Sequence, residues 1–363
     1  MLKYNAITDV PGILVGYFAN RATGTTVVLV EGEGAVGGVS VVGAAPGTRE
    51  TDALRPENLV VRVNAVVLSG GSAYGLEAAA GVMRYLEDRK RGFPINQEHV
   101  VPIVPAAVLF DLGRGGNWQE RPTAEFGYRA CLAATSGTVA QGNVGAGTGA
   151  VAGGLKGGIG TASIFLEGGL IVGAIVAVNS YGSPIDPRTG FPYARYLEVE
   201  GEFGLEGAKP RVPQRAHREN LGPLRNTTIG VVATNARLSK AQATKVAQMA
   251  QDGIARAIRP AHTMFDGDTI FALATGEVEA ALTGGPFGSE EEMKVNLIGT
   301  AASDVVARAI VHAVLSAESA LGFPGYRELY LKRKQPIKSE TSNSSFLRRS
   351  DSKNSQEGKT NDG

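Results

Sequence analysis

The chain has 363 residues, of which 43% are hydrophobic, and a formal net charge of +1. This length and composition allow a sizeable hydrophobic core, and the near-zero charge argues against nucleic acid as a partner. Cys131 is the only cysteine and the four histidines have no H-x-x-x-H spacing, which excludes an intramolecular disulfide and predicts no metal or other cofactor. The N-terminal segment lacks the apolar core of a signal peptide, and no run of about 18 apolar residues occurs. We therefore expect a cytoplasmic protein that does not span a membrane.

The first part of the chain alternates short apolar runs with glycines, a pattern that predicts buried strands separated by turns. Apolar residues at helical spacing predict a helix over residues 76–86 that ends at Gly92. A second helix is predicted from about residue 124 to 135. The predicted strands of this part are residues 13–18, 25–30, 39–42, 59–68 and 100–110.

The middle of the chain is rich in glycine from residue 142 to 173 and ends in a strong strand, 170–178, followed by Asn179. The polar, proline-bearing stretch 180–223 then predicts a long loop.

The last third restarts with a strand over residues 228–234. Ser239 and Gln242 form a capping box, which predicts that a helix begins there. A strand at 269–274 and a helix at about 290–319, broken near Gly299, complete the pattern. We expect residues 1–330 to form a single domain and residues 331–363, which are polar and charged, to be a disordered tail.

The glycine-rich middle raises the possibility of a phosphate site, because glycines expose backbone N–H groups to anions. Lys156 is followed by Gly157, so the G-K-[ST] ending of a P-loop is absent, and "GAGTGA" lacks G-x-G-x-x-G spacing. A nucleotide-dependent transferase that uses this loop stays open as an alternative. Ser72 does not fit a nucleophile elbow, because Tyr74 stands two positions later, and we expect its hydroxyl to cap a strand-to-helix turn.

A different chemistry fits "LRNTTIGVVATNA", which begins at Leu224. A threonine hydroxyl is a poor nucleophile without a base, and a threonine at a chain N-terminus carries one, its α-amine, with a pKa of about 7.7 to 8.0. Exposing that amine requires the chain to cut itself between Asn226 and Thr227. The residue types alone also allow a loop asparagine followed by β-branched strand residues.

Several ordered motifs resemble the DmpA-like family of N-terminal-nucleophile hydrolases, which includes L-aminopeptidase/D-amino-acid esterase-amidases, β-peptidyl aminopeptidases and nylon-oligomer hydrolases. The resemblance covers nearly the whole chain up to about Phe323. It implies an α/β (α+β) fold of the αββα type, self-cleavage into an α chain (1–226) and a β chain (227–363), and a homo-oligomer, often a tetramer. The Asn-Thr-Thr site is more similar to the nylon-oligomer branch, in which the first threonine is the nucleophile. The motifs are "GNVGAGTGAVAGGLKGGIGTAS", "VNSYGSP", "NTTIGVVATNARLSKAQATKVAQMAQDGIARAI" and "PAHTMFDGDTIFALATG".

The resemblance also implies roles for single residues. Asn179 matches an amide donor to the oxyanion, although a lone asparagine at a strand end is also typical of a turn. Asp266 and Asp268 match an acidic pair that orients the nucleophile, although Asp-Gly-Asp alone is typical of a hairpin turn. Two carboxylates beside one ammonium favour its protonated form, so the pair helps only if one is itself protonated or hydrogen-bonded elsewhere. Lys156 matches an active-site cation, or is a solvated loop cation.

One position departs from the aminopeptidase members of the family. Some carry an active-site tyrosine after the "VPAAV" stretch, where this chain has Phe110 and Asp111. This favours the nylon-oligomer branch or a broader amidase. The hypothesis is a self-processing amide hydrolase that acts on short peptides, amino-acid amides or 6-aminohexanoate oligomers, and a catalytically inactive scaffold of the same fold is a further alternative.

Overall fold

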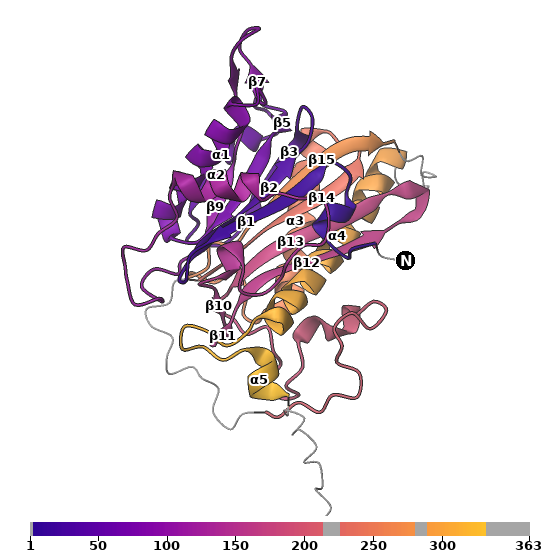
Figure 1. Ribbon diagram of the computed structural model, residues 1–363. Helices are drawn as coiled ribbons and strands as arrows, with labels where there is room; N and C mark the ends of the chain where they lie inside the picture. The colour runs from indigo at the N-terminus through magenta and orange to yellow at the C-terminus, as the bar shows by residue number, and fades with distance from the viewer. Residues whose placement is uncertain (1–2, 213–225, 280–288, 332–363) are drawn as a thin grey trace, which may run out of the picture. The chain divides into compact units, whose positions relative to one another are not determined.

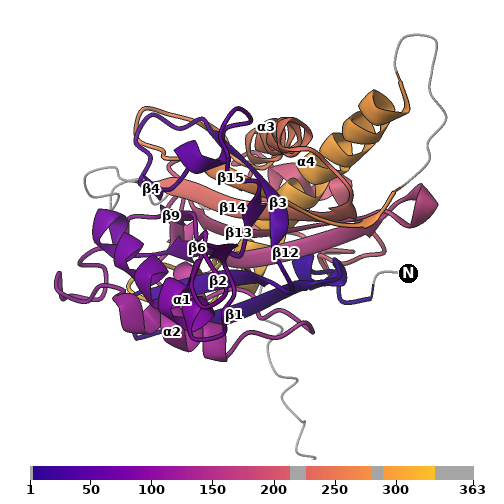
Figure 2. The ribbon, with the colours of Figure 1, turned by 90° about the horizontal axis from the view of Figure 1, so that it is seen from above.

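The computed structural model describes residues 3–212, 226–279 and 289–331, which belong to one compact unit, Met1–Lys332. Two β-sheets pack face to face, and helices cover the outer face of each (Figures 1 and 2). This is the predicted αββα arrangement. Residues 332–363 of the predicted tail lie outside the described residues, so its disorder stays a prediction.

The first sheet has five strands in the order β1-β2-β6-β9-β4, and only β6 and β9 run parallel. Its strands are β1 (Ile13–Ala19), β2 (Gly24–Val30), β4 (Thr48–Arg49), β6 (Ala65–Ser69) and β9 (Ala106–Val108).

The second sheet has six strands in the order β12-β13-β14-β15-β3-β5, with β14 and β15 parallel. Two small hairpins, β7 with β8 and β10 with β11, lie outside both sheets. The strands are β3 (Ala35–Val41), β5 (Arg62–Val63), β12 (Gly158–Phe165), β13 (Ile171–Asn179), β14 (Thr227–Ala236) and β15 (Thr269–Val278), and the hairpins are β7 (Phe93–Pro94), β8 (Val100–Val101), β10 (Val151–Ala152) and β11 (Leu155–Lys156).

Each sheet has its own pair of helices. The five-stranded sheet packs against α1 (Ala78–Glu87) and α2 (Ala124–Leu132), and the six-stranded sheet against α3 (Lys240–Ala257) and α4 (Glu290–Ser316) (Figure 2). A short helix, α5 (Tyr326–Tyr330), follows α4. The predicted capping box at Ser239 is confirmed: its hydroxyl accepts from the Gln242 N–H, and the Gln242 side chain accepts from the Ser239 N–H.

Strand β14 is buried along its whole length because both faces of its sheet are covered. Ile229 and Val231 point into the layer between the sheets, whereas Val232 points toward α3 and α4. Alternation along a strand assigns every side chain of β14 to one of these two layers. The continuous apolar run in the sequence follows from this double burial.

Helix α4 is long and apolar enough to cross a membrane, with a mean hydropathy of 1.4 over its best window, but 83% of that window is buried inside the protein. It is a core helix. The predicted break near Gly299 is wrong: α4 continues through this residue, and a Cβ there would lie 2.3 Å from Met249 Sδ of α3. Glycine at this position allows the two helices to approach closely.

Three other boundaries differ from the prediction. The segment 59–68 begins outside the sheets, with Leu59 82% exposed, and from Arg62 on it forms two strands, β5 and β6, in different sheets. The segment 100–110 is interrupted by Pro102 and Pro105, which have no N–H to donate to a neighbouring strand. Helix α1 ends at Glu87, because Lys90 adopts a left-handed conformation before Gly92 is reached.

A buried ionic cluster ties the loop after β13 to α4. Arg308 of α4 donates to Glu202 at 2.6 and 2.8 Å, and His312 Nε2 lies 2.8 Å from the same carboxylate. Although burial alone raises the pKa of Glu202, the hydrogen bonds from His312 and Arg308 hold it down to about 2. The predicted loop 180–223 is therefore anchored within its described part, and its residues 213–223 lie outside the described residues.

The close contact between β12 and α4 predicts that adding one methyl group at Gly160 lowers the stability of the protein. A Cβ on Gly160 would lie 1.9 Å from the backbone oxygen of Ala309, so we expect Gly160→Ala to lower the free energy of unfolding by about 1 to 3 kcal/mol or more. Gly137 has nothing within 4 Å of a Cβ, and Gly137→Ala is the matched control. Urea unfolding of both variants measures this, and equal stability of the two would contradict the packing described.

Candidate active site

The start of β14 lies at one end of the six-stranded sheet, between β13 and β15. Thr227 pairs with Asn179, the last residue of β13. On the other side Asn226 forms a parallel bridge with Asp266, just before β15. Four of the predicted site residues, Asn179, Thr227, Asp266 and Asp268, therefore meet at the same sheet end.

Strand alternation directs two of these side chains into the layer between the sheets. Thr227 has the same parity as Ile229, and Asn179 has the same parity as Ile175, and both isoleucines belong to the core between the sheets. Residues directly opposite each other on antiparallel strands have Cβ atoms about 4.5 to 5.5 Å apart. Thr228 has the opposite parity and points toward the helices.

A cavity of about 310 Å³ opens at Thr227. Its walls come from the loop before β4, the turn after β6, the end of β9 and the loop before β15. Apart from Thr227 and Asn226, it is lined by Ala45, Pro46, Gly47, Ser72, Ala73, Val108, Phe110, Met264 and Phe265.

Thr227 is buried, with 5% of its surface exposed. The hydroxyl Oγ1 donates to the backbone oxygen of Asn226 at 2.5 Å. The nucleophilic oxygen of the hypothesis thus lies beside the carbonyl group that self-cleavage would attack.

The amide of Asn179 is held in one orientation. Its Oδ1 accepts from the Arg114 guanidinium at 2.5 Å and from the Val151 N–H at 3.0 Å. Because Oδ1 is thereby identified as the acceptor, Nδ2 is the donor, and it donates to the Phe110 backbone oxygen at 3.3 Å. The amide is fully buried, Asn179 stands opposite Thr227 in the ladder, and Phe110, which accepts from Nδ2, lines the same cavity as Thr227.

Asp268 links the nucleophile segment to the loop before β15. Its Oδ1 accepts from the Thr228 N–H at 2.7 Å, and its Oδ2 lies 2.8 Å from His262 Nδ1 and 3.2 Å from the His262 backbone N. The hydrogen bond to Asp268, more than the opposing effect of burial, raises the pKa of His262.

Asp266 is bound by its neighbours. Thr263 donates to Oδ2 from its backbone N at 3.0 Å and from Oγ1 at 2.5 Å, and the Tyr181 N–H donates to Oδ1 at 3.2 Å. Burial raises the pKa of Asp266, and the adjacent Asp268 adds to this. The sequence analysis expects the pair to help only if one acid is protonated or hydrogen-bonded elsewhere, and both acids accept hydrogen bonds from other residues.

The backbone of the acidic pair is fixed by the segment after β3. Val42 N–H donates to the Asp268 backbone oxygen at 3.0 Å, and Ala45 N–H donates to that of Asp266 at 2.9 Å. A Cβ on Gly43 would lie 2.3 Å from Asp268 N, so this close approach requires glycine.

Lys156 is fully buried, so the interpretation as a solvated loop cation is wrong. Its Nζ donates to the backbone oxygens of Gly147, Ala150 and Gly157 at 2.8, 3.0 and 2.7 Å. Burial, with a smaller effect of Arg114, lowers the pKa of Lys156 to about 7. The three carbonyl acceptors match the three N–H groups of an ammonium, and Lys156 thus fastens the loop from which Val151 contacts Asn179.

Three side chains at this site carry no signal that singles them out in the sequence: Arg114, His262 and Thr263. Arg114 reaches Asn179 from 65 residues away through the fold, whereas His262 and Thr263 lie six and three residues before Asp268 and Asp266 in the same loop. The prediction for Ser72 is only partly right. It follows the turn after β6, but Gly71 occupies the cap position, no side-chain cap bond forms, and Ser72 lines the cavity.

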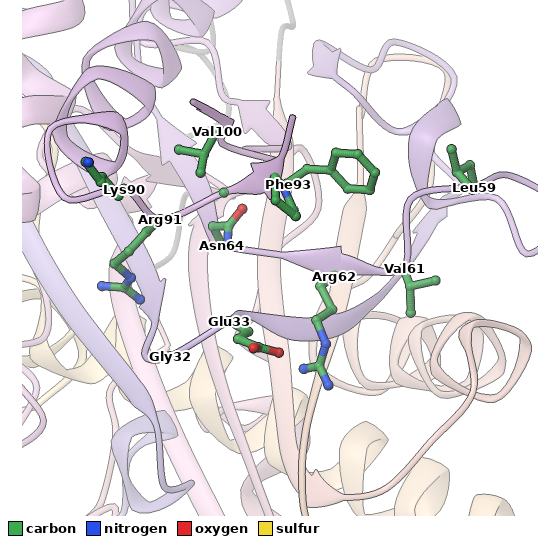
Figure 3. Close-up of a pocket in the computed structure, with 12 residues that line it drawn as sticks. Gly32, Glu33, Leu59, Val61, Arg62, Asn64, Lys90, Arg91, Phe93 and Val100 are labelled. Atoms are coloured by element: carbon green, nitrogen blue, oxygen red, sulfur yellow. The ribbon is translucent and has the colours of Figure 1, made fainter. Parts of the chain in front are cut away.

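A second cavity, of about 500 Å³, lies beside the start of β3 and β5, at the opposite end of the six-stranded sheet (Figure 3). Lys90, Arg91 and Phe93 line it, and none of its lining residues is a serine, threonine or cysteine. In the described part of the chain no cluster of three potential metal ligands occurs. The smaller cavity is therefore the candidate active site.

The family model of Peptidase family S58 matches residues 5–327. The chain belongs to this family. An uncharacterized aminopeptidase of Mycobacterium leprae is 52% identical over 342 residues, covering 89% of this chain and 93% of that protein. A 6-aminohexanoate-oligomer endohydrolase of Kocuria sp. is 31% identical over 322 residues, 84% of each.

Solved structures agree with the fold of this S58 peptidase. The β-aminopeptidase of Burkholderia sp. has a TM-score of 0.66 at 26% identity, covering 90% of this chain and 92% of that one. The L-aminopeptidase D-Ala-esterase/amidase of Ochrobactrum anthropi, described as a variant of the Ntn hydrolase fold, has a TM-score of 0.67 at 24% identity, covering 91% of each. The protein is a hydrolase of amide bonds, and neither the nucleotide-dependent transferase nor the inactive scaffold is favoured.

Lys156 provides a test of how the S58 site is built. Lys156→Met keeps much of the side-chain length but leaves three buried carbonyls without their donor, so we expect a loss of about 3 to 5 kcal/mol of unfolding free energy. Lys240, which donates to two backbone oxygens at the edge of the fold, gives the control Lys240→Met, with a smaller expected loss. Urea unfolding compares them, and an unchanged stability of Lys156→Met would mean that the loop does not depend on this cation.

Proposed function

We propose that the chain cuts itself between Asn226 and Thr227 and then hydrolyses short amides with Thr227 as nucleophile. The observation that carries the proposal is the position of Thr227 Oγ1, 2.5 Å from the Asn226 backbone oxygen at the wall of the cavity. Asn179 donates to the oxyanion, Asp266 and Asp268 orient the nucleophile segment, and Lys156 holds the loop behind Asn179.

In self-cleavage, Oγ1 of Thr227 adds to the carbonyl carbon of Asn226. The bond from that carbon to Thr227 N then breaks as the nitrogen takes up the hydroxyl proton, leaving an ester between Asn226 and Oγ1. Water hydrolyses the ester, which gives a carboxylate on Asn226, regenerates the hydroxyl and leaves a free α-amine on Thr227.

In turnover, the α-amine accepts the Oγ1 proton as Oγ1 attacks the substrate carbonyl. The amine then donates that proton to the leaving nitrogen, and an acyl-enzyme forms. The same amine next activates a water that releases the acid. Each step uses only Thr227, water and the amide donor of Asn179.

We infer that the substrates are short amides: an N-terminal residue of a small peptide, an amino-acid amide or a 6-aminohexanoate oligomer. Val108, Phe110 and Phe265 give the cavity apolar walls, which suits aliphatic acyl groups. The relative named an aminopeptidase supports peptide substrates, and the relative named a 6-aminohexanoate-oligomer endohydrolase supports the oligomers.

Two further expectations belong to the same proposal: assembly as a homo-oligomer, with a tetramer of α/β pairs as the expected form, and a cytoplasmic location. Exposed apolar side chains near the β7–β8 hairpin support the first of them. They are Leu59, Val61, Phe93, Ile95 and Val101.

Two adjacent threonines allow a direct test of the nucleophile. Thr227→Ala removes the hydroxyl beside the Asn226 carbonyl, so we expect no chain cleavage and no amide hydrolysis. Thr228 Oγ1 is buried and has no hydrogen-bond partner in the described structure, so Thr228→Val should cleave and hydrolyse as the wild type does. Intact mass, N-terminal sequencing and amide turnover measure both variants.

The outcome decides between the two residues. A smaller chain that starts Thr-Thr-Ile in the wild type and Thr-Val-Ile in Thr228→Val supports Thr227. Cleavage and turnover that survive Thr227→Ala would end the proposal.

Asn179 predicts a separate kinetic signature. Asn179→Ala removes the amide donor, and we expect kcat to fall by about 100- to 1,000-fold with a much smaller change in KM. The matched control is Asn143→Ala, because the Asn143 amide pairs with the Glu318 backbone instead. A loss of less than about threefold in kcat on processed protein would remove Asn179 from the mechanism.

A further inference from the structure

His262 and Asp268 form a pair beside the nucleophile segment. Asp268 is 1% exposed, and each of its carboxylate oxygens has a partner: the Thr228 N–H on one side, and the ring and backbone nitrogens of His262 on the other. His262 itself is in a left-handed conformation, with φ of 54°, which the surrounding structure must impose. The loop therefore aims this ring at one carboxylate.

The pair bears on a requirement of the proposed mechanism. A base must be neutral to accept a proton, and an α-amine of ordinary pKa, about 7.7 to 8.0, is only just available near neutral pH. A buried carboxylate within about 4 to 6 Å raises the pKa of an amine by favouring the ammonium. An unpartnered Asp268 would thus hold the Thr227 amine in its inactive, protonated form.

We propose that His262 is a positioning residue that neutralises Asp268, so that the α-amine of mature Thr227 stays available as a base. The inference rests on the proposed function, because it needs Thr227 at a chain N-terminus. A protonated His262 ring held against the Asp268 side chain balances its charge toward Thr227, while Asp268 still fixes the Thr228 N–H. The raised pKa of His262 agrees with a ring that carries its proton near neutral pH.

The other charged groups that the described structure brings to the start of β14 are Asp266, Asp111, Arg114 and Lys156. Lys156 is held by three backbone oxygens behind Asn179, and burial lowers its pKa to about 7, but it is the same in the wild type and in every variant compared below. Asp266 is engaged by Thr263 and Tyr181. Arg114 and Asp111 lie behind Asn179, where the two interact with each other, and burial raises the pKa of Asp111. Asp268 is therefore the carboxylate that His262 faces.

The test is the pH profile of kcat/KM for His262→Asn. Asparagine tolerates a positive φ, and its Nδ2 takes the place of His262 Nδ1, so the variant keeps a hydrogen bond to Asp268 and loses only the charge. We expect the acidic limb of the profile to move up by about 1 to 3 pH units, which is a fall of tenfold or more at pH 6. The rate at high pH should stay within about threefold of the wild type.

Two control variants sharpen the result. His99→Asn makes the same chemical change at an exposed histidine of the β7–β8 turn and should leave the profile unmoved. In the double variant His262→Asn with Asp268→Asn no carboxylate is left to hold the ammonium, so the limb should return toward lower pH, at a reduced maximal rate.

The wild-type protein gives an independent readout if a variant fails to fold. The rate at which an acylating reagent labels the Thr227 amine, followed against pH, reports the pKa of that amine. A value at or below about 8 is expected, and a value well above the ordinary range of an α-amine would overturn the inference. An unmoved limb in cleaved, active His262→Asn would also overturn it while leaving the proposed function intact. Wild-type protein that never exposes Thr227 would instead reject the proposed function itself.

Discussion

The site depends on the register of β14 between its two neighbours. Antiparallel pairing sets Thr227 opposite Asn179, and the parallel alignment with β15 sets Asn226 level with Asp266. A slip of one residue would move Thr227 to the helix side of the sheet and replace it in the cavity by a neighbour. The register is held because β14 is buried on both faces, with Ile229 and Val231 in one core and Val232 in another.

The second constraint is that charged side chains buried at the site need hydrogen-bond partners, and residues at fixed positions provide them. Lys156 is held by three carbonyls, Arg114 by Asn179 and the Gly149 backbone oxygen, and Asp268 by Thr228 and His262. Removing one partner from such a buried group leaves the other uncompensated, which costs more than the pair contributes. The site is thus rigid for electrostatic reasons, and rigidity is what an oxyanion donor requires.

Local sequence patterns predict the main strands and the helix start at Ser239 well, because each depends on neighbouring residues. The family resemblance is likewise carried by short runs of neighbouring residues. The register of β14 could not be predicted, since it is set by contacts among three distant strands. The same holds for Arg114, whose partner Asn179 lies 65 residues away. His262 lies only six residues from Asp268, but their contact depends on the loop conformation, with a positive φ at His262, which no local residue pattern indicates. The sequence allows two interpretations of Lys156, and burial, which excludes the solvated one, is a property of packing rather than of its glycine neighbours.

On the proposed mechanism, the peptide at Asn226 is the first substrate of the site that it later exposes. Its carbonyl occupies the place beside Thr227 Oγ1 that a substrate carbonyl must take, and both residues line the same cavity. Scission releases Asn226, whereas Thr227 stays anchored by the ladder of β14 with β13 and β15. The hydroxyl and the amide of Asn179 therefore need not move between the single cleavage of the precursor and repeated turnover. What changes is the nitrogen of Thr227, which goes from a peptide N–H to a free base, and this is why the charge balance around Asp268 matters only after the chain has been cut.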